Sequence, residues 1–500
     1  MKKIYFTFLL IAILFTACSS SESSNSSDYT NSTPPSLPIN NEQNSSNETM
    51  SFAVSVPSIT PSNEFICIYF NDLNPPLKMN NQGANRWQID LNSSSINSIE
   101  YKYSRNCEYE AADEYLGTTG IGWRKFTFAA GSAQEDMVSK WRWLTVDLLS
   151  FDLNTTGYIL TKPKNLNKSN FIAGVMLNDW WREEWMEPMN ETLTKVVTDT
   201  NSSWVQYTPI PEITQLYPVP KIKKIANNGT SDADMVSIIQ KVHAKGLKFF
   251  LNPSPWSFKE DNSTENHTQE WWNEFEGQWR PIMLEYAQMA EDNGVEMLAF
   301  RMWPNIDGLN DSENAKINAL ASTLLTDVRA IYNGKISVQS ICYDTSKHLL
   351  DVHKNSDYVT MKIFSFYPWN LGATQDDNVS QIFTTLQEKI NDCHTYYTNE
   401  NISNVIVEQL SAASYDGSII NLNTSDEGID SFHEDNVSFS LDLQEQADVY
   451  EAALHIISKE DWIVGNFAFT YFYWDSVGKD INIRAKPAEK VVSKWYGWMK

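Results

Sequence analysis

The chain has 500 residues, 42% of them hydrophobic, and a formal net charge of -25. This length exceeds one ordinary hydrophobic core and suits a small domain joined to a larger one. The negative charge argues against nucleic acid as a partner, because phosphate binding relies on clustered lysine and arginine, and it favours a neutral or cationic ligand.

The first residues are typical of an export signal. Met1-Lys2-Lys3 precede an apolar run, Ile4 to Phe15, and then Thr16-Ala17-Cys18. The run is too short to cross a membrane as a helix, and the small residues form a cleavage site. A cysteine at this point resembles a bacterial lipoprotein signal, in which Cys18 becomes the lipidated first residue; the alternative is an ordinary secretory peptide with an incidental cysteine. We therefore expect an exported protein anchored through Cys18 to a membrane, in the cell envelope or on the outer surface.

Residues 19–50 are mostly Ser, Asn, Thr and Pro, with few large apolar side chains. Such a segment cannot bury enough surface to fold, so it is predicted to be a disordered tether. The remaining chain divides by composition into an all-β sandwich at 51–150 and a larger α/β domain at 165–500.

The amino-terminal domain shows short alternating runs, such as Phe65 to Tyr69 and Trp87 to Leu91, between clusters of Asn, Pro, Gly and Ser. Closely spaced short strands of this kind predict an all-β sandwich. Cys67 and Cys107 fall in this domain, and Cys342 and Cys393 in the next. Export permits a Cys67–Cys107 disulfide, although spacing alone does not establish it. The chain has no CxxC pair and no HExxH motif, so we expect no zinc site and no metal.

Three segments of this domain, Phe52 to Pro57, Ile99 to Arg105 and Arg124 to Phe128, are similar to starch-binding modules of carbohydrate-binding family 20. The resemblance implies a sandwich that accompanies a hydrolase. Tryptophans can stack on sugar rings, and they also serve as core or interdomain packing. The candidates are Trp87, Trp123, Trp141 and Trp143.

From about Asn170 onward, strand-like apolar runs alternate with longer helical segments, which predicts repeated βα units and a (β/α)8 TIM barrel. The eight predicted strands are Phe171 to Leu177, Trp204 to Thr208, Leu247 to Leu251, Met297 to Met302, Ile336 to Ser340, Tyr358 to Phe364, Val405 to Val407 and Ile463 to Phe472. The helices predicted between them are Asp232 to Lys245, Glu270 to Asp292, Lys316 to Ile331 and Leu443 to Ser458.

Glu408 directly follows the apolar run Val405 to Val407. Active sites of TIM barrels lie at the C-terminal ends of the strands, so Glu408 is the first candidate for a catalytic residue. The alternative is an ion-paired carboxylate at the barrel rim.

Several segments of this domain resemble glycoside hydrolase family 113, retaining barrel enzymes that cleave β-1,4-mannan. They are Val242 to Lys248, Tyr286 to Glu291, Val328 to Lys335, Glu445 to Ala452 and Lys486 to Val492. The resemblance implies that Glu408 is the nucleophile. The family's acid/base glutamate falls on Met302 or Trp303, and its Lys-Pro-His after the third strand is replaced by Asn252-Pro253-Ser254.

Retaining hydrolysis needs a second carboxyl group, about 5 to 5.5 Å from the nucleophile. Asp307, in the loop after the fourth strand, is the predicted substitute acid, and Asp179 after the first strand is another. Loop hydrogen bonds or helix caps are the alternative role for both.

Aromatic residues follow five of the predicted strands, where they would meet at one mouth and form a sugar-lined cleft. They are Trp180, Trp181, Trp256, Trp303, Tyr367, Trp369, Tyr473 and Trp474. Among these we predict substrate binding for Trp180, Trp256, Trp303, Tyr367 and Trp474.

The sequence therefore predicts a cell-surface glycoside hydrolase that needs no cofactor and acts on a β-linked polysaccharide, with mannan favoured. The alternative is a glycan-binding protein on a degenerate hydrolase barrel, since the usual acid is missing. A purely structural surface protein would leave the aromatic residues unexplained, and fold alone does not decide among the three.

Overall fold

The structure is a computed structural model. It describes residues 48–71, 73–93, 98–108, 112–127, 133–145, 157–164, 166, 168, 170–178, 181–224, 229–255, 267–302, 311–340, 342, 349–364, 379–418 and 440–500. The predicted signal, Cys18 and nearly all of the predicted tether lie outside these residues. No described helix is both long and apolar enough to span a membrane.

The amino-terminal domain consists of two four-stranded sheets, ordered β4-β5-β1-β8 and β3-β2-β6-β7. Their strands are β1 Glu48–Ser55, β2 Ile66–Phe70, β3 Leu73–Lys78, β4 Asn80–Gly83, β5 Arg86–Ser93, β6 Ser98–Arg105, β7 Arg124–Thr127 and β8 Ala133–Met137. The ring of Phe52 in β1 packs against the other sheet, because its centroid lies 5.6 Å from that of Phe70, 5.0 Å from that of Tyr101 and 5.3 Å from that of Phe126. The predicted sandwich is confirmed.

The second domain is a closed parallel barrel in the order β10-β13-β14-β15-β16-β17-β18-β9, which confirms all eight predicted strands. The strands are β9 Ile172–Leu177, β10 Trp204–Tyr207, β13 Lys248–Leu251, β14 Met297–Phe300, β15 Lys335–Gln339, β16 Tyr358–Phe364, β17 Val405–Ser411 and β18 Ile463–Tyr471. Helices cover the outer face of the barrel and side chains fill its interior, so both faces of each strand are buried. This explains why the strands are nearly continuous apolar runs. Gly174 shows how tight the interior is, because a Cβ there would lie 2.4 Å from the Phe467 ring.

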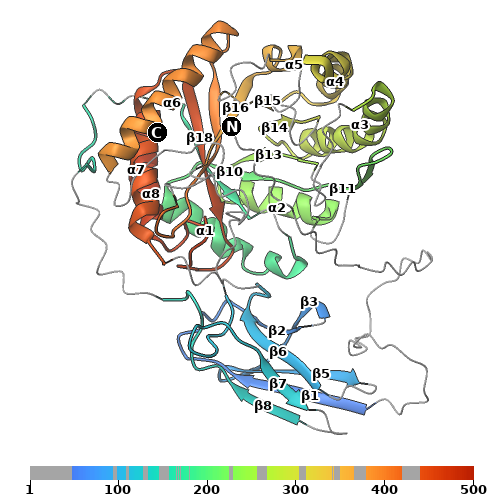
Figure 1. Cartoon of the computed structure of the whole chain (residues 1–500), viewed down its shortest axis with the longest axis vertical. Coiled ribbons are helices and arrows are strands. Elements are labelled where there is room, and N and C mark those ends of the chain that lie inside the picture. The colour runs from blue at the N-terminus through green and yellow to red at the C-terminus, as the bar shows by residue number, and fades with distance from the viewer. Residues whose placement is uncertain are drawn as a thin grey trace, which may run out of the picture.

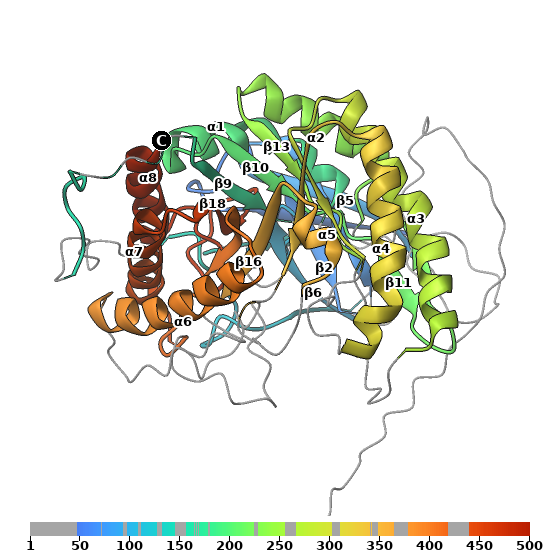
Figure 2. The same cartoon turned by 90° about the horizontal axis from the view of Figure 1, so that it is seen from above.

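Helices surround the barrel (Figures 1 and 2). They are α1 Met189–Thr200, α2 Asp232–Ala244, α3 Gln269–Asp292, α4 Asp311–Ile331, α5 Asp351–Lys354, α6 Val379–Asn399, α7 Leu443–Lys459 and α8 Pro487–Met499. A short 3-10 helix, η2 Glu183–Met186, precedes α1. A β-hairpin of β11 Glu212–Gln215 and β12 Lys221–Lys223 follows β10. The four predicted helices are confirmed. Three of them follow a capping residue, since the side chains of Ser231, Thr268 and Asp442 accept hydrogen bonds from backbone amides in the first turns of α2, α3 and α7.

Two disulfides close long loops of the described chain. One joins Cys67 to Cys107, the pairing that the sequence left open, and the other joins Cys342, after β15, to Cys393 in α6. Each bond lies within one domain.

The sandwich lies against one end of the barrel, beside α1 and the loop after β18 (Figure 1). Trp185 of η2 donates from Nε1 to the Asn106 carbonyl at 2.9 Å, and Arg105 donates from Nη2 to the Asp475 carbonyl at 3.2 Å. The amide of Val477 donates to the Trp143 carbonyl at 2.8 Å. Trp185 and Arg105 are both buried, so this is a packed interface rather than a flexible link.

Candidate active site

Glu408 lies on a β-bulge of β17. Met361 of β16 pairs with Val407, but the next residue, Lys362, pairs with Gln409, so Glu408 is the extra residue of its strand. The pairing with β18 shifts at the same place, between Val407 and Leu410. Bulges redirect side chains near active sites, and this one lets both Glu408 and Gln409 contact residues of the barrel interior.

Three side chains hold the Glu408 carboxylate: Thr360 lies within β16, and Asn252 and Arg301 directly follow β13 and β14. Oε1 accepts hydrogen bonds from Asn252 Nδ2 at 3.0 Å and from Arg301 Nη2. Oε2 accepts a hydrogen bond from the Thr360 hydroxyl at 2.5 Å. Arg301 also donates from Nε to Asn252 Oδ1 at 2.8 Å, so Asn252 bridges the ion pair.

Burial by itself would raise the pKa of Glu408, whose side chain is fully enclosed. The positive charges of Arg301 and Lys362, with the hydrogen bonds from Thr360 and Asn252, outweigh this effect and hold the pKa below its ordinary value. Glu408 is therefore ionised at neutral pH. Glu408 contacts the residues that directly follow β13 and β14, so it lies toward the C-terminal end of the barrel, and an ionised carboxylate there is the form that a nucleophile requires.

The end of β14 carries a cation and an apolar side chain where the family 113 resemblance places the acid/base. Arg301 follows the last residue of the strand and points its guanidinium at Glu408, while its carbonyl accepts a hydrogen bond from Trp279 Nε1 at 2.6 Å. Met302 is fully buried. Neither side chain can donate a proton to a leaving group at neutral pH.

Most of the other predicted site residues lie outside the described residues. These are Asp307 and Asp179, the tryptophans Trp180, Trp256, Trp303 and Trp369, and Tyr367. Their roles remain predictions.

The prediction for Trp474 needs correction. Its side chain is fully buried, with the ring of Trp185 at 5.2 Å and that of Phe472 at 5.1 Å. Trp181 and Tyr473 belong to the same packed group, 6.0 Å apart. These rings pack on one another, and the sandwich contacts the group at Trp185 and at the neighbouring Asp475 carbonyl, so the buried Trp474 presents no face to a sugar. In the sandwich, Trp87 and Trp141 are also buried.

Arg301 and Thr360 were not among the predicted site residues, and Asn252 appeared only as a departure from the family pattern. A signal for two of them exists in the sequence: Asn252 and Arg301 are polar residues that directly follow apolar strand runs, as Glu408 does. Thr360 lies in the middle of β16, where no such signal is available.

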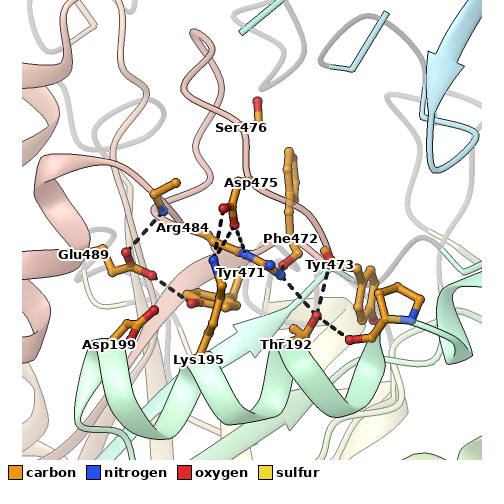
Figure 3. A network of polar contacts seen from close by, with 12 residues as sticks. Thr192, Lys195, Asp199, Tyr471, Phe472, Tyr473, Asp475, Ser476, Arg484 and Glu489 are labelled. Carbon is orange, nitrogen blue, oxygen red and sulfur yellow. Dashed lines mark hydrogen bonds and ion pairs between the residues drawn. The ribbon is translucent and has the colours of Figure 1, made fainter. Parts of the chain in front are cut away.

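A second polar network lies between α1, the loop after β18 and the start of α8 (Figure 3). Asp475 accepts hydrogen bonds from Lys195 Nζ at 3.0 Å and from Arg484 Nε at 2.6 Å, and Arg484 Nη1 reaches Thr192 at 3.1 Å. In the same network, burial and the charge of Asp199 raise the pKa of Glu489 to about 7. Because Arg105 of the sandwich contacts the Asp475 carbonyl, this network supports the domain interface.

Among the described residues, one group of carboxylates is spaced for a metal ion: Asp416, Asp442 and Glu445 have oxygens within 4.8 Å of one another. Two of the three already have structural partners. Asp442 caps α7, and Glu445 accepts a hydrogen bond from the Gly417 amide at 2.8 Å. The group is explained as a loop-to-helix junction.

The closed parallel barrel with external helices is a TIM barrel. No protein-family model and no curated protein sequence matches the chain. The GH113 β-mannanase AaManA from Alicyclobacillus acidocaldarius in complex with ManMIm is similar in structure, with a TM-score of 0.50 and 16% identity over 66% of this chain and 98% of that chain. Another GH113 β-1,4-mannanase gives a TM-score of 0.49 at 17% identity over 65% and 99% of the two chains. The Ignisphaera aggregans GH53 catalytic domain gives 0.39 at 15% identity over 65% and 95%.

At these identities the similarity shows the fold: the barrel has the fold found in glycoside hydrolases. The predicted resemblance to family 113 is thereby confirmed for the architecture of the barrel. The β-mannanase activity and the resemblance of the sandwich to starch-binding modules remain predictions.

Proposed function

We propose that this protein is a retaining glycoside hydrolase acting on a β-linked polysaccharide of the mannan type, with Glu408 as its nucleophile. The observation that supports it most strongly is the ionised Glu408 carboxylate on the bulge of β17, at the end of the barrel where TIM-barrel enzymes carry their catalytic groups. The shared fold with β-mannanases agrees with this role.

The hydrogen bonds distinguish the two oxygens of Glu408. Oε1 accepts hydrogen bonds from both Arg301 and Asn252, whereas the hydrogen bond found for Oε2 among the described residues comes from the hydroxyl of Thr360, which can rotate away. We therefore assign the attack on the anomeric carbon to Oε2. The glycosidic C–O bond breaks as the Oε2–carbon bond forms, the leaving oxygen takes a proton from an acid, and water later hydrolyses the glycosyl ester.

The acid of this scheme is Asp307, which lies outside the described residues. It must come within about 5 to 5.5 Å of Glu408 for a retaining reaction. Loss of general acid help would slow cleavage of an ordinary glycosidic bond by roughly 10²- to 10⁴-fold, so Asp307→Asn is expected to reduce turnover by that amount.

A second candidate function is glycan binding without hydrolysis. The observation that favours it is the ion pair between Arg301 and Glu408, together with the buried Met302 where an acid would belong. In this alternative the carboxylate orients Arg301 and Asn252 and never attacks.

The experiment that separates the two functions uses protein from residue 48 onward, incubated with mannan, glucan, xylan and starch while reducing ends and binding are both measured. Hydrolysis predicts release of reducing ends from mannan, and loss of that release in Glu408→Gln, which keeps the size of the side chain. Binding that persists in Glu408→Gln, with no release by either protein, would establish the second function. Neither binding nor release on any of the four polymers would refute both.

We further propose that the protein is exported and anchored to a membrane through a lipid on Cys18, where it meets its polysaccharide at the cell envelope. Support comes from the signal pattern and from the two disulfides. Labelling cells with a radioactive fatty acid should mark the wild type and leave Cys18→Ala unlabelled; equal labelling of both would contradict the anchor.

A further inference from the structure

Two glutamines lie in the barrel interior beside Glu408 and have no role in the scheme above. Gln206, in β10, is completely buried, and Gln409, the residue after Glu408, is 7% exposed. Both amide nitrogens donate to one thioether: Nε2 of Gln206 lies 3.5 Å from Met176 Sδ, and Nε2 of Gln409 lies 3.4 Å from the same atom. The bulge of β17 therefore places Gln409 and the Glu408 carboxylate on the same interior wall.

These amides are poorly satisfied for their burial. A thioether is a weak acceptor, and Gln206 Oε1 has no hydrogen-bond partner among the described residues. A buried polar group without a partner costs about 1 to 3 kcal/mol, and TIM-barrel interiors are ordinarily filled by branched apolar residues. A methionine or leucine would fill the same interior space without that cost.

A buried amide that destabilises the free protein is explained when a ligand completes its hydrogen bonds. The group that fits is a hydroxyl, because it can donate to the free Oε1 and accept from an Nε2 that leaves Met176 Sδ. The two amides lie close together, since both reach Met176 Sδ, and with the neighbouring Glu408 carboxylate they offer donors and acceptors to a ring with several hydroxyls. The weak bonds to Met176 let both side chains reorient at little cost.

We propose that Gln206 and Gln409 form a recognition pair for the hydroxyl groups of the sugar ring that is seated at Glu408. The pair determines which sugar is held there and takes no part in bond breaking. This inference rests on the proposed function, since it requires that the barrel binds a glycan.

The test replaces each amide with an apolar side chain of similar length, Gln206→Met and Gln409→Met, in protein from residue 48 onward. Calorimetry measures binding of β-1,4-mannohexaose and of cellohexaose, and urea denaturation measures stability. One lost hydrogen bond corresponds to a roughly tenfold weaker affinity. We expect that loss for each variant on the oligosaccharide that the wild type prefers, with a denaturation midpoint equal to or above that of the wild type.

Gln446 provides a matched control, because it is equally buried in α7 and its Nε2 donates to the carbonyls of Ala412 at 2.8 Å and Asn482 at 3.2 Å. Gln446→Met should lower the midpoint and leave the affinity unchanged. Gln206→Leu serves as a second variant in case Gln206→Met does not fold.

The outcomes separate this inference from the proposed function. A wild type that binds an oligosaccharide, with Gln206→Met and Gln409→Met binding it equally well, overturns the recognition pair alone. A fall in midpoint without a change in affinity does the same and makes the glutamines structural. If the wild type binds neither oligosaccharide, the proposed function is refuted for these ligands, and the recognition pair is refuted with it.

Discussion

Arg301, the first residue after the fourth barrel strand, donates a hydrogen bond to the carboxylate of Glu408, the bulged residue of the seventh. The pair is almost completely buried, with side-chain exposures of 4% and 0%. A buried ion pair is seldom strongly stabilising in itself, but removing one member leaves an uncompensated charge. The interaction keeps Glu408 ionised, and it occupies the oxygen Oε1 with a hydrogen bond.

Replacing Arg301 should therefore be costly and should change the titration of Glu408. We expect Arg301→Met to lower the free energy of unfolding by about 3 to 5 kcal/mol, because it leaves a buried carboxylate without its main cation. The pKa of Glu408 should rise, since burial then acts against a smaller opposing charge. Urea denaturation measures the first effect. The double variant Arg301→Met, Glu408→Gln should be more stable than the single Arg301→Met, and equal stability of the two would contradict the coupling.

The Thr360 hydroxyl donates a hydrogen bond to Glu408 Oε2, the oxygen assigned to the attack. Thr360→Val keeps the shape of the side chain and removes this hydrogen bond, so we expect the free energy of unfolding to fall by about 1 to 3 kcal/mol. Thr360→Ser retains the hydroxyl and should stay close to the wild type in stability. Denaturation curves for the three proteins test this, and a loss in Thr360→Ser with none in Thr360→Val would show that the methyl group matters instead.

The raised pKa of Glu489 predicts that the free energy of unfolding depends on pH. Burial and the charge of Asp199 raise its pKa from an ordinary 4.5 to about 7 in the folded protein, where the Tyr471 hydroxyl and the Ala485 amide donate to it. A raised carboxyl pKa stabilises the fold fully below about pH 4.5, and this contribution is lost as the pH rises through 7. Its size is on the order of 3 kcal/mol, from the shift in pKa.

Glu489→Gln should accordingly flatten the curve of unfolding free energy against pH between about 4.5 and 7. The exposed Glu388 of α6 gives a control, since Glu388→Gln should leave the curve as in the wild type. An unchanged curve in Glu489→Gln would contradict the assignment.

The packed interface predicts that the sandwich and the barrel unfold together. Scanning calorimetry of the wild type should show one transition, because Trp185 and Arg105 are buried between the domains and hydrogen-bonded across them. Trp185→Ala should remove about 3 to 5 kcal/mol and separate the transition into two. Two resolved transitions already in the wild type would contradict a single cooperative unit.

The positions of the barrel strands could be predicted from the sequence, because a strand buried on both sides must be apolar along its length. The predicted strand Tyr358 to Phe364 has the same bounds in the structure. The seventh strand was predicted to end at Val407, but it continues to Ser411. The polar residues Glu408 and Gln409 resemble a strand end, and the bulge that keeps them inside the barrel depends on pairing with β16 and β18.

The site could be predicted only in part. Glu408 follows from its place after an apolar run, whereas its partner Arg301 depends on how two strands distant in sequence align across the barrel. The prediction for Trp474 failed for a related reason. Its position after β18 suggested an exposed rim, but the sandwich, which is more than 300 residues away in sequence, contacts this loop at the neighbouring Asp475 carbonyl.

The measurement that tests the central claim most directly is covalent trapping of Glu408. A 2-deoxy-2-fluoro-β-mannosyl fluoride carries a leaving group that departs without a proton, so it probes the nucleophile independently of the acid. The account predicts that intact-protein mass spectrometry detects one added fluoromannosyl group, that peptide mapping places it on Glu408, and that Glu408→Gln gains no mass. A wild type that binds mannohexaose and gains no mass from the fluoride would contradict the nucleophile and leave the barrel as a glycan-binding protein.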